Sequence, residues 1–145
     1  MIDISTKDVS VRTAKAKGTI ALGENAFEII KQGTCKKGDV FTTAKIAAIQ
    51  AVKSTPNLIP MCHPIPIEGI EVDFEQDESE KTVTIAVSVK STGKTGVEME
   101  ASCGAAAGCL TIYDMLKYAD KAMIIKDVKL MEKAGGKSGD YKRPD

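Results

Sequence analysis

Apolar and polar residues alternate along four segments of the chain, and a side-chain period of two is typical of strands that bury one face. The alternation is cleanest over residues 67–76 and 82–90, which a polar turn at residues 77–80 separates, so these segments predict an antiparallel hairpin. Shorter runs with the same period predict a first strand over residues 12–22 and a last strand over residues 123–132.

The segments between these strands have the pattern of helices. Residues 25–31 predict a short helix that ends at Gly33, and residues 40–53 predict a longer one with Asp39 as its N-cap. A third, long helix follows the hairpin and ends near Asp120. A hairpin with helices crossing one face is an α+β arrangement, so we expect a ferredoxin-like antiparallel sheet with the helices packed on one face.

The two ends of the chain lack either period. Residues 1–11 predict an irregular arm, and residues 133–145 form a polar, Gly-rich segment that we expect to be a mobile tail. The length is that of one domain, and we expect residues 1–145 to form a single domain with an aliphatic core.

The long helix carries charges at both ends and small apolar residues between them. A helix that is apolar on nearly every side is buried, and Asp114 and Lys117, three residues apart, project from the same face. One interpretation is a core helix with frayed, charged ends. The other is that the two charged groups are held together for a chemical purpose, and the residues alone leave both open.

Glu100 and Asp114 lie at opposite ends of this helix. In an unbroken helix they are ~21 Å apart along the axis, so they cannot share one small reaction centre within one chain. Three arrangements remain open: Glu98 and Glu100 lie outside the regular helix, the ligand is long, or two subunits build each site.

Two further residues are candidates on local grounds. Lys37 precedes a helix N-terminus, where it is either a solvated turn residue or part of an anion site with the free backbone N–H groups. His63, the only histidine, lies in a segment with four prolines over residues 55–66. It is either structural or held by this stiff loop to contact a ligand.

Two Gly-Lys turns, at residues 93–95 and 136–138, resemble part of a P-loop. Walker A requires a glycine five residues before the Gly-Lys pair, and those positions hold Ser88 and Met131. We therefore exclude nucleotide hydrolysis by a P-loop, although each turn could hold phosphate oxygens with its N–H groups and its lysine.

The composition excludes other classes of protein. Basic and acidic residues number 20 each, so the formal net charge is zero, whereas a dedicated nucleic-acid binder usually has a basic excess. Tryptophan is absent and only three Phe and three Tyr are present, which leaves no stacking platform for single strands. We therefore expect no nucleic-acid partner. Because the chain has only one histidine, we also expect no site for a transition-metal ion.

Four cysteines, at positions 35, 62, 103 and 109, have neither CxxC nor zinc-finger spacing. They predict buried free thiols in a reducing compartment. No apolar run approaches the ~18 residues of a membrane span, and the N-terminus has no signal-peptide core. We expect a cytoplasmic protein with no membrane partner.

Six segments together resemble the cyclic pyranopterin monophosphate synthase family of molybdenum cofactor biosynthesis. They cover residues 1–5, 37–40, 58–64, 92–101, 111–115 and 135–139. Departures are small: Met61 stands where the family usually has leucine, and Cys35-Lys36 precede Lys37 where histidine is common.

The resemblance implies an enzyme whose substrate is a 3′,8-cyclised dihydro-GTP and whose products are cyclic pyranopterin monophosphate and pyrophosphate. It also implies a ferredoxin-like fold and a homohexamer, a trimer of dimers, with active sites between subunits. We expect no cofactor, and Mg²⁺ carried in by the triphosphate substrate is left open as the one metal ion at the site.

The resemblance also assigns roles to residues of this chain. The catalytic group comprises Asp114 as acid/base, its neighbour Lys117, and Lys37. The residues that contact substrate are Met61, Cys62, His63, Met99 and Glu100, with Asp3, Arg12, Glu98 and Lys133 as further members of the pocket. The competing hypothesis is a non-catalytic oligomer that binds a ligand, and release of pyrophosphate distinguishes the two.

Overall fold

The computed structural model describes residues 1–145 and contains one five-stranded antiparallel sheet with the order β2-β3-β1-β4-β5. Four helices accompany it, and the chain order follows the sequence prediction. The elements are β1 (Ser10–Ala21), α1 (Glu24–Gln32), α2 (Val40–Lys53), α3 (Thr55–Leu58), β2 (Gly69–Asp77), β3 (Thr82–Gly93), α4 (Glu98–Leu116), β4 (Ile124–Ala134) and β5 (Tyr141–Lys142).

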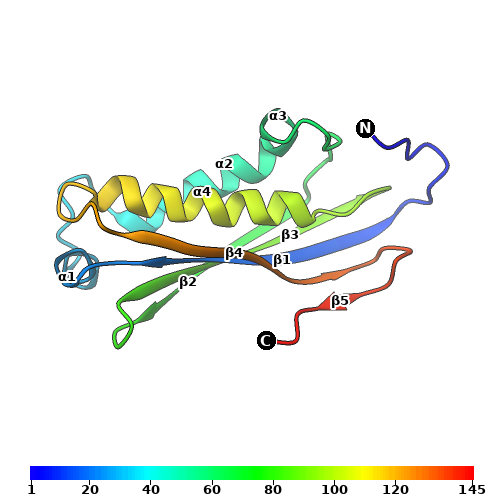
Figure 1. Cartoon of the computed structure of the whole chain (residues 1–145). Helices are drawn as coiled ribbons and strands as arrows, with labels where there is room; N and C mark the ends of the chain where they lie inside the picture. The colour runs from blue at the N-terminus through cyan, green and yellow to red at the C-terminus, as the bar shows by residue number, and fades with distance from the viewer.

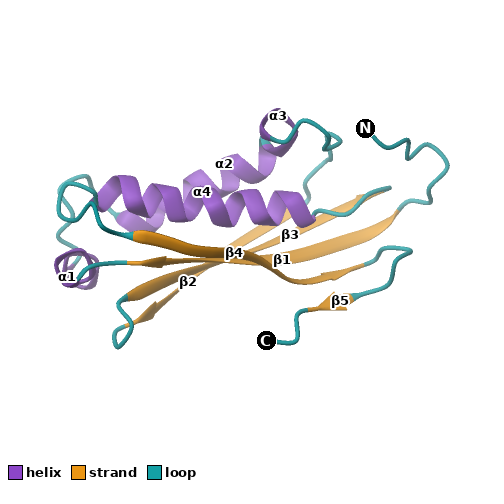
Figure 2. Ribbon diagram, viewed as in Figure 1, coloured by secondary structure: helices purple, strands orange, loops and turns teal.

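The predicted ferredoxin-like arrangement is confirmed. Strands β2 and β3 form the hairpin, and β1 lies between β3 and β4 with antiparallel pairing to both. Helices α2 and α4 form one layer against one face of the sheet, and the opposite face carries no helix (Figures 1 and 2).

Small residues allow α4 to lie very close to the sheet. A Cβ at Gly18 of β1 would stand 3.1 Å from the Ala105 carbonyl oxygen, and one at Gly104 would stand 3.0 Å from a methyl group of Val87 in β3. Ala101 and Ala105 are fully buried at this contact. The apolar middle of the predicted long helix is therefore the centre of the core, and it fixes both helix ends relative to the sheet.

The C-terminus of α1 and the N-terminus of α2 form where the sequence predicts them, whereas α4 ends at Leu116, before the expected Asp120. Gly33 ends α1 with a left-handed φ of 66°, and the Asp39 side chain accepts a hydrogen bond of 2.6 Å from the Thr42 N–H at the start of α2. Helix α4 begins at Glu98, so both Glu98 and Glu100 lie in its first turn. The first of the three arrangements considered for Glu100 and Asp114 is therefore wrong.

Three predictions need correction. The expected mobile tail is instead ordered, because residues 133 and 134 complete β4 and β5 pairs back onto it. The proline-rich connector contains the short helix α3 with Pro56 in its first turn. Of the four free cysteines only Cys109 is buried, and the other three are half-buried.

Candidate active site

The C-terminal end of α4 carries a cluster of one carboxylate and two ammonium groups. The Lys117 Nζ lies 2.7 Å from Asp114 Oδ1, as expected for an (i, i+3) pair. The Lys37 Nζ lies 3.1 Å from Asp114 Oδ2 and donates a second hydrogen bond of 2.8 Å to the Asp114 carbonyl oxygen. Both proposed catalytic lysines therefore contact the same aspartate.

The loop before α2 brings Lys37 to this position. The backbone N–H of Lys36 donates to the Tyr118 hydroxyl at 3.0 Å, and the Cys35 thiol donates to the Met115 carbonyl oxygen at 3.4 Å. These contacts fasten the loop to the end of α4. Lys37 is an exposed turn residue, as one of the two local interpretations predicts, and its ammonium group also contacts the Asp114 carboxylate, which neither interpretation included.

The ion pairs fix the charge state of the cluster. Hydrogen bonds from Lys117 and Lys37 hold the pKa of Asp114 below its ordinary value, and Asp114 in turn raises the pKa of Lys117. The Asp114 side chain remains 55% exposed, so a ligand from outside the chain can reach it. An exposed carboxylate between two ammonium groups can accept a proton and return one.

A second group of predicted residues meets at the opposite end of α4. A cavity of about 570 Å³ lies between the start of α4, the loop after α3 and the N-terminal arm. Its walls include five of the predicted substrate-contacting residues and Glu98: Met61, Cys62, His63, Glu98, Met99 and Glu100. We call this the apolar pocket, since seven of its 13 lining residues are hydrophobic.

Glu100 is the most deeply buried acid in the apolar pocket. Only 2% of the residue is exposed. Burial, followed by the neighbouring charge of Glu98, raises its pKa above the ordinary value. Burial likewise raises the pKa of the Cys62 thiol, which keeps it protonated. A carboxyl group with a raised pKa is suited to proton transfer near neutral pH.

Asp3 borders the apolar pocket without lining it. Its carboxylate accepts a 2.8 Å hydrogen bond from the Ser5 N–H, which is the main reason why its pKa is lowered, with smaller contributions from Lys94 and His63. The arm residues that line the pocket are instead Met1, Ile2, Ile4 and Lys7.

A second cavity, of about 610 Å³, adjoins the apolar pocket and shares Lys7, Thr95, Gly96 and Glu98 with it. We call it the basic pocket, because it is lined by five cationic and two anionic side chains: Lys7, Arg12, Lys94, Lys133, Lys137, Asp8 and Glu98. The predicted residues Arg12 and Lys133 lie here. The resemblance did not assign Lys7, Lys94 or Lys137, although the two Gly-Lys turns contain the last two.

The predicted residues therefore form two separate groups within one chain. Asp114, Lys117 and Lys37 lie at the C-terminal end of α4, and the two pockets lie at its N-terminal end, one helix length away. The structure does not bring Lys37, His63 and Asp114 into one cleft of the single chain.

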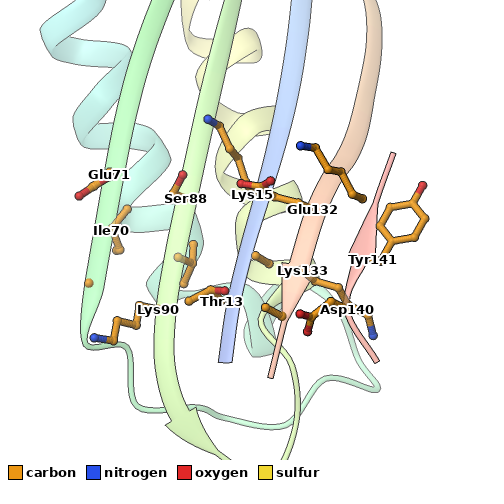
Figure 3. Close-up of a pocket in the computed structure, with 15 residues that line it drawn as sticks. Thr13, Lys15, Ile70, Glu71, Ser88, Lys90, Glu132, Lys133, Asp140 and Tyr141 are labelled. Carbon is orange, nitrogen blue, oxygen red and sulfur yellow. The ribbon is translucent and has the colours of Figure 1, made fainter. Parts of the chain in front are cut away.

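A further cavity, of about 690 Å³, lies on the sheet face that carries no helix. Figure 3 shows it crossing β2, β3, β1, β4 and β5, with Lys15, Ser88 and Glu132 on its polar floor. Lys133 is the one predicted site residue that lines it.

Metal and membrane sites were also considered. No group of three or more His, Cys, Asp or Glu side chains is arranged to hold a metal ion. None of the helices has both the length and the apolar character needed to cross a bilayer.

Comparison with known proteins agrees with the resemblance. The cyclic pyranopterin monophosphate synthase of Helicobacter hepaticus is 51% identical over 145 residues, which cover 100% of this chain and 91% of that protein. The enzymes of the same name from Staphylococcus haemolyticus and Staphylococcus aureus are 49% and 51% identical, and the matches cover 99% of this chain and 91% and 89% of those proteins. The model of the MoaC family matches residues 1–136, and this chain belongs to that family.

Proposed function

We propose that this protein converts (8S)-3′,8-cyclo-7,8-dihydroguanosine 5′-triphosphate into cyclic pyranopterin monophosphate and pyrophosphate, in molybdenum cofactor biosynthesis. Its relatives carry the name of the enzyme that makes this product. The observation that supports the proposal best is the cluster in which Lys37 and Lys117 both contact Asp114, because the reaction needs both proton transfer and cationic stabilisation.

The reaction places two demands on the site. The purine-derived ring system must be rearranged to a pterin, which moves protons on and off ring nitrogens and sugar oxygens. A sugar hydroxyl oxygen must then bond to the α-phosphorus while the bond to the bridging oxygen breaks, and pyrophosphate leaves with that electron pair. Asp114 is the acid/base that takes up the hydroxyl proton, and Lys37 and Lys117 stabilise the charge that develops on phosphate.

The apolar pocket is suited to the ring system of the substrate. Met61 and Met99 offer polarizable apolar surface, and Glu100 offers an acidic hydrogen-bonding group at its wall. We assign Cys62 and His63 to the same pocket as substrate contacts, with Asp3 acting from the arm beside it.

The enzyme acts as a homohexamer, a trimer of dimers, with each active site between two subunits. This proposal rests on the separation of the catalytic cluster from the pockets within one chain. The sheet face without helices (Figure 3) gives each subunit a broad surface that a second copy could cover. A two-fold axis would set the cluster of one chain against the pockets of its partner and create two equal sites.

No resident metal is needed for this scheme. Lysine and arginine side chains supply the positive charge, and any Mg²⁺ arrives with the triphosphate substrate. We place the enzyme in the cytoplasm, where its four free cysteines stay reduced.

The variants Asp114→Asn and Lys117→Met test the catalytic cluster. Both side chains are about half exposed, so the variants are expected to fold normally. Pyrophosphate release and pterin formation from the cyclised substrate are expected to fall by a factor of about 10²–10⁴, the usual effect of losing an acid/base group.

Glu78→Gln is the matched control, because it breaks another exposed carboxylate–lysine pair, the one with Lys31. It is expected to retain full turnover. Wild-type turnover in both cluster variants would remove these residues from the mechanism. Substrate binding by the wild-type protein without any release of pyrophosphate would instead favour the ligand-binding oligomer.

A further inference from the structure

The turn that carries Lys37 passes the C-terminal end of α4 on its way from α1 to α2 (Figure 1). The Gly38 N–H donates a 3.2 Å hydrogen bond back to the Cys35 carbonyl oxygen, which closes the turn. Gly38 has a φ of +109°, a value that glycine adopts without strain. Lys36 and Lys37 lie between these two residues and are exposed. An exposed lysine has many side-chain rotamers, so contacts with α4 must determine where its ammonium group lies.

Tyr118 makes two contacts with the residue that precedes Lys37. Its hydroxyl oxygen accepts a 3.0 Å hydrogen bond from the Lys36 backbone N–H. Its ring also lies beneath the Lys36 ammonium group, with Nζ 5.4 Å from the ring centroid, which is a cation–π distance. The backbone contact is the more important one, because the position and direction of the Lys36 peptide determine where the Lys37 side chain begins.

The backbone of Tyr118 is itself held by the helix. The N–H groups of Ala119 and Asp120 both donate to the Leu116 carbonyl oxygen, at 2.8 and 3.2 Å, so hydrogen bonding to the helix continues past the last residue of α4. Tyr118 follows Asp114 by four residues, and this spacing places both side chains on the same side of the helix. Tyr118 therefore gives the turn a fixed contact one helical turn beyond the catalytic carboxylate.

The other contacts of the turn are weaker. The Cys35 thiol, a weak donor, lies 3.4 Å from the Met115 carbonyl oxygen. The side chains of Lys37 and Asp114 are 39% and 55% exposed, and an ion pair between exposed groups contributes little to a fixed geometry. In the proposed mechanism Lys37 also stabilises charge on phosphate, so its ammonium group must be free to move from the carboxylate. The contact with Tyr118 is the one that keeps the turn in place during that movement.

We propose that Tyr118 is a positioning residue for the catalytic step, because it holds the turn of residues 35–38 against α4 and keeps Lys37 within reach of Asp114. This inference rests on the proposed function. The hydrogen bond and the cation–π contact of Tyr118 both go to Lys36, so Tyr118 acts through that residue. A cation that is already in place when negative charge develops on phosphate needs no reorganisation during the reaction.

Tyr118→Phe tests this role, because phenylalanine keeps the ring beneath Lys36 and loses only the hydroxyl. We expect pyrophosphate release from the cyclised substrate to show a kcat about three- to tenfold lower, as for the loss of one neutral hydrogen bond, with KM unchanged. In a Lys37→Met background the same substitution is expected to leave the residual rate unchanged, because no ammonium group remains to be positioned. Single-turnover measurements make this low residual rate accessible.

Tyr113→Phe is the matched control. The Tyr113 hydroxyl also forms a hydrogen bond of 3.0 Å at the end of α4, but it donates to the Lys121 carbonyl oxygen and not to the turn. The control is expected to keep the kcat of the wild type. A loss as large as that of Tyr118→Phe would mean that any weakening of this helix end lowers the rate, and it would overturn the proposal.

A second readout needs no turnover, so it separates this proposal from the proposed function. Hydrogen bonds from Lys117 and Lys37 lower the pKa of Asp114. Because Lys37 is held less firmly in Tyr118→Phe, we expect the pKa of Asp114 to rise there towards its ordinary value of 3.8. NMR titration of the Asp114 carboxyl carbon measures this shift, and Tyr113→Phe is expected to show none. An unchanged pKa in Tyr118→Phe, or an equal loss of kcat with and without Lys37, would overturn the positioning role. If the wild type releases no pyrophosphate, the proposed function fails, and the NMR titration alone decides the role of Tyr118.

Discussion

Glu100→Gln is expected to make the protein more stable at neutral pH, although it removes a group from the candidate active site. Glu100 is 2% exposed, and no lysine, arginine or histidine pairs with it. Burial is the main cause of its raised pKa. Glutamine has nearly the same shape and no charge, so the variant keeps the packing of the first turn of α4 and removes the cost of a buried carboxylate.

The sign of the pH dependence follows from proton binding. The pKa of Glu100 is higher in the folded state than the ordinary value of 4.5, which applies to the unfolded state. Between these two pKa values the folded protein therefore binds more protons than the unfolded chain does at the same pH. Stability is therefore lost between the unfolded and the folded pKa and stays lower above both. Each unit of separation between the two pKa values lowers the free energy of unfolding by about 1.4 kcal/mol at high pH.

The assay is urea denaturation of both proteins at a fixed protein concentration from pH 4 to pH 8, with an NMR titration of the Glu100 carboxyl carbon. The two stabilities are expected to coincide near pH 4 and to diverge above it, and the NMR pKa should account for the divergence. Glu98→Gln is the matched control, because it breaks the pair with Lys133 and is expected to give no gain. Parallel stability curves, or a Glu100→Gln variant that is less stable at pH 8, would refute the reasoning.

Two further predictions concern the turn that begins at Gly135, beside the basic pocket, and the proposed active site between two subunits. Gly135→Ala is expected to lower the denaturation midpoint more than Gly139→Ala, because both glycines have positive φ but only Gly135 faces a backbone oxygen. Mixed assemblies of Asp114→Asn and Arg12→Met chains are expected to recover about a quarter of wild-type turnover, since random pairing of two-fold dimers restores one of two sites in half of them. Recovery of no turnover after mixing would mean that each site lies within one chain.

The sheet could be predicted because its four long strands repeat a period that sequence alone displays. The hairpin of β2 and β3 follows directly from the alternation on either side of residues 77–80. Strand β5 was missed for the opposite reason: two residues, Tyr141 and Lys142, are too short to show any period. The position of β5 is set by its pairing with β4. The glycines that precede β5 made the segment resemble a mobile tail, so no pattern in the sequence indicated this pairing.

The site was predictable only where its geometry is local. The contact between Asp114 and Lys117 follows from helical spacing, whereas the approach of Lys37 depends on a loop 77 residues away in sequence. No periodicity could reveal that approach: the local sequence marked Lys37 only as a turn residue or a member of an anion site, and the family resemblance alone grouped it with Asp114. Lys94 and Lys137 were predictable in part. Their Gly-Lys turns can be recognised in the sequence, but only the order of the strands in the sheet places both lysines around one pocket.

One rigid element explains why the two halves of the site stay apart. Helix α4 has 19 residues and therefore spans about 28 Å, and its glycine and alanine contacts with β1 and α2 prevent it from bending to bring its ends together. A substrate that needs both ends must then meet the ends of two different helices. Under the proposed function, this close packing would make subunit pairing a condition of catalysis. A more loosely packed helix would hold neither the buried Glu100 nor the exposed Asp114 in a fixed place.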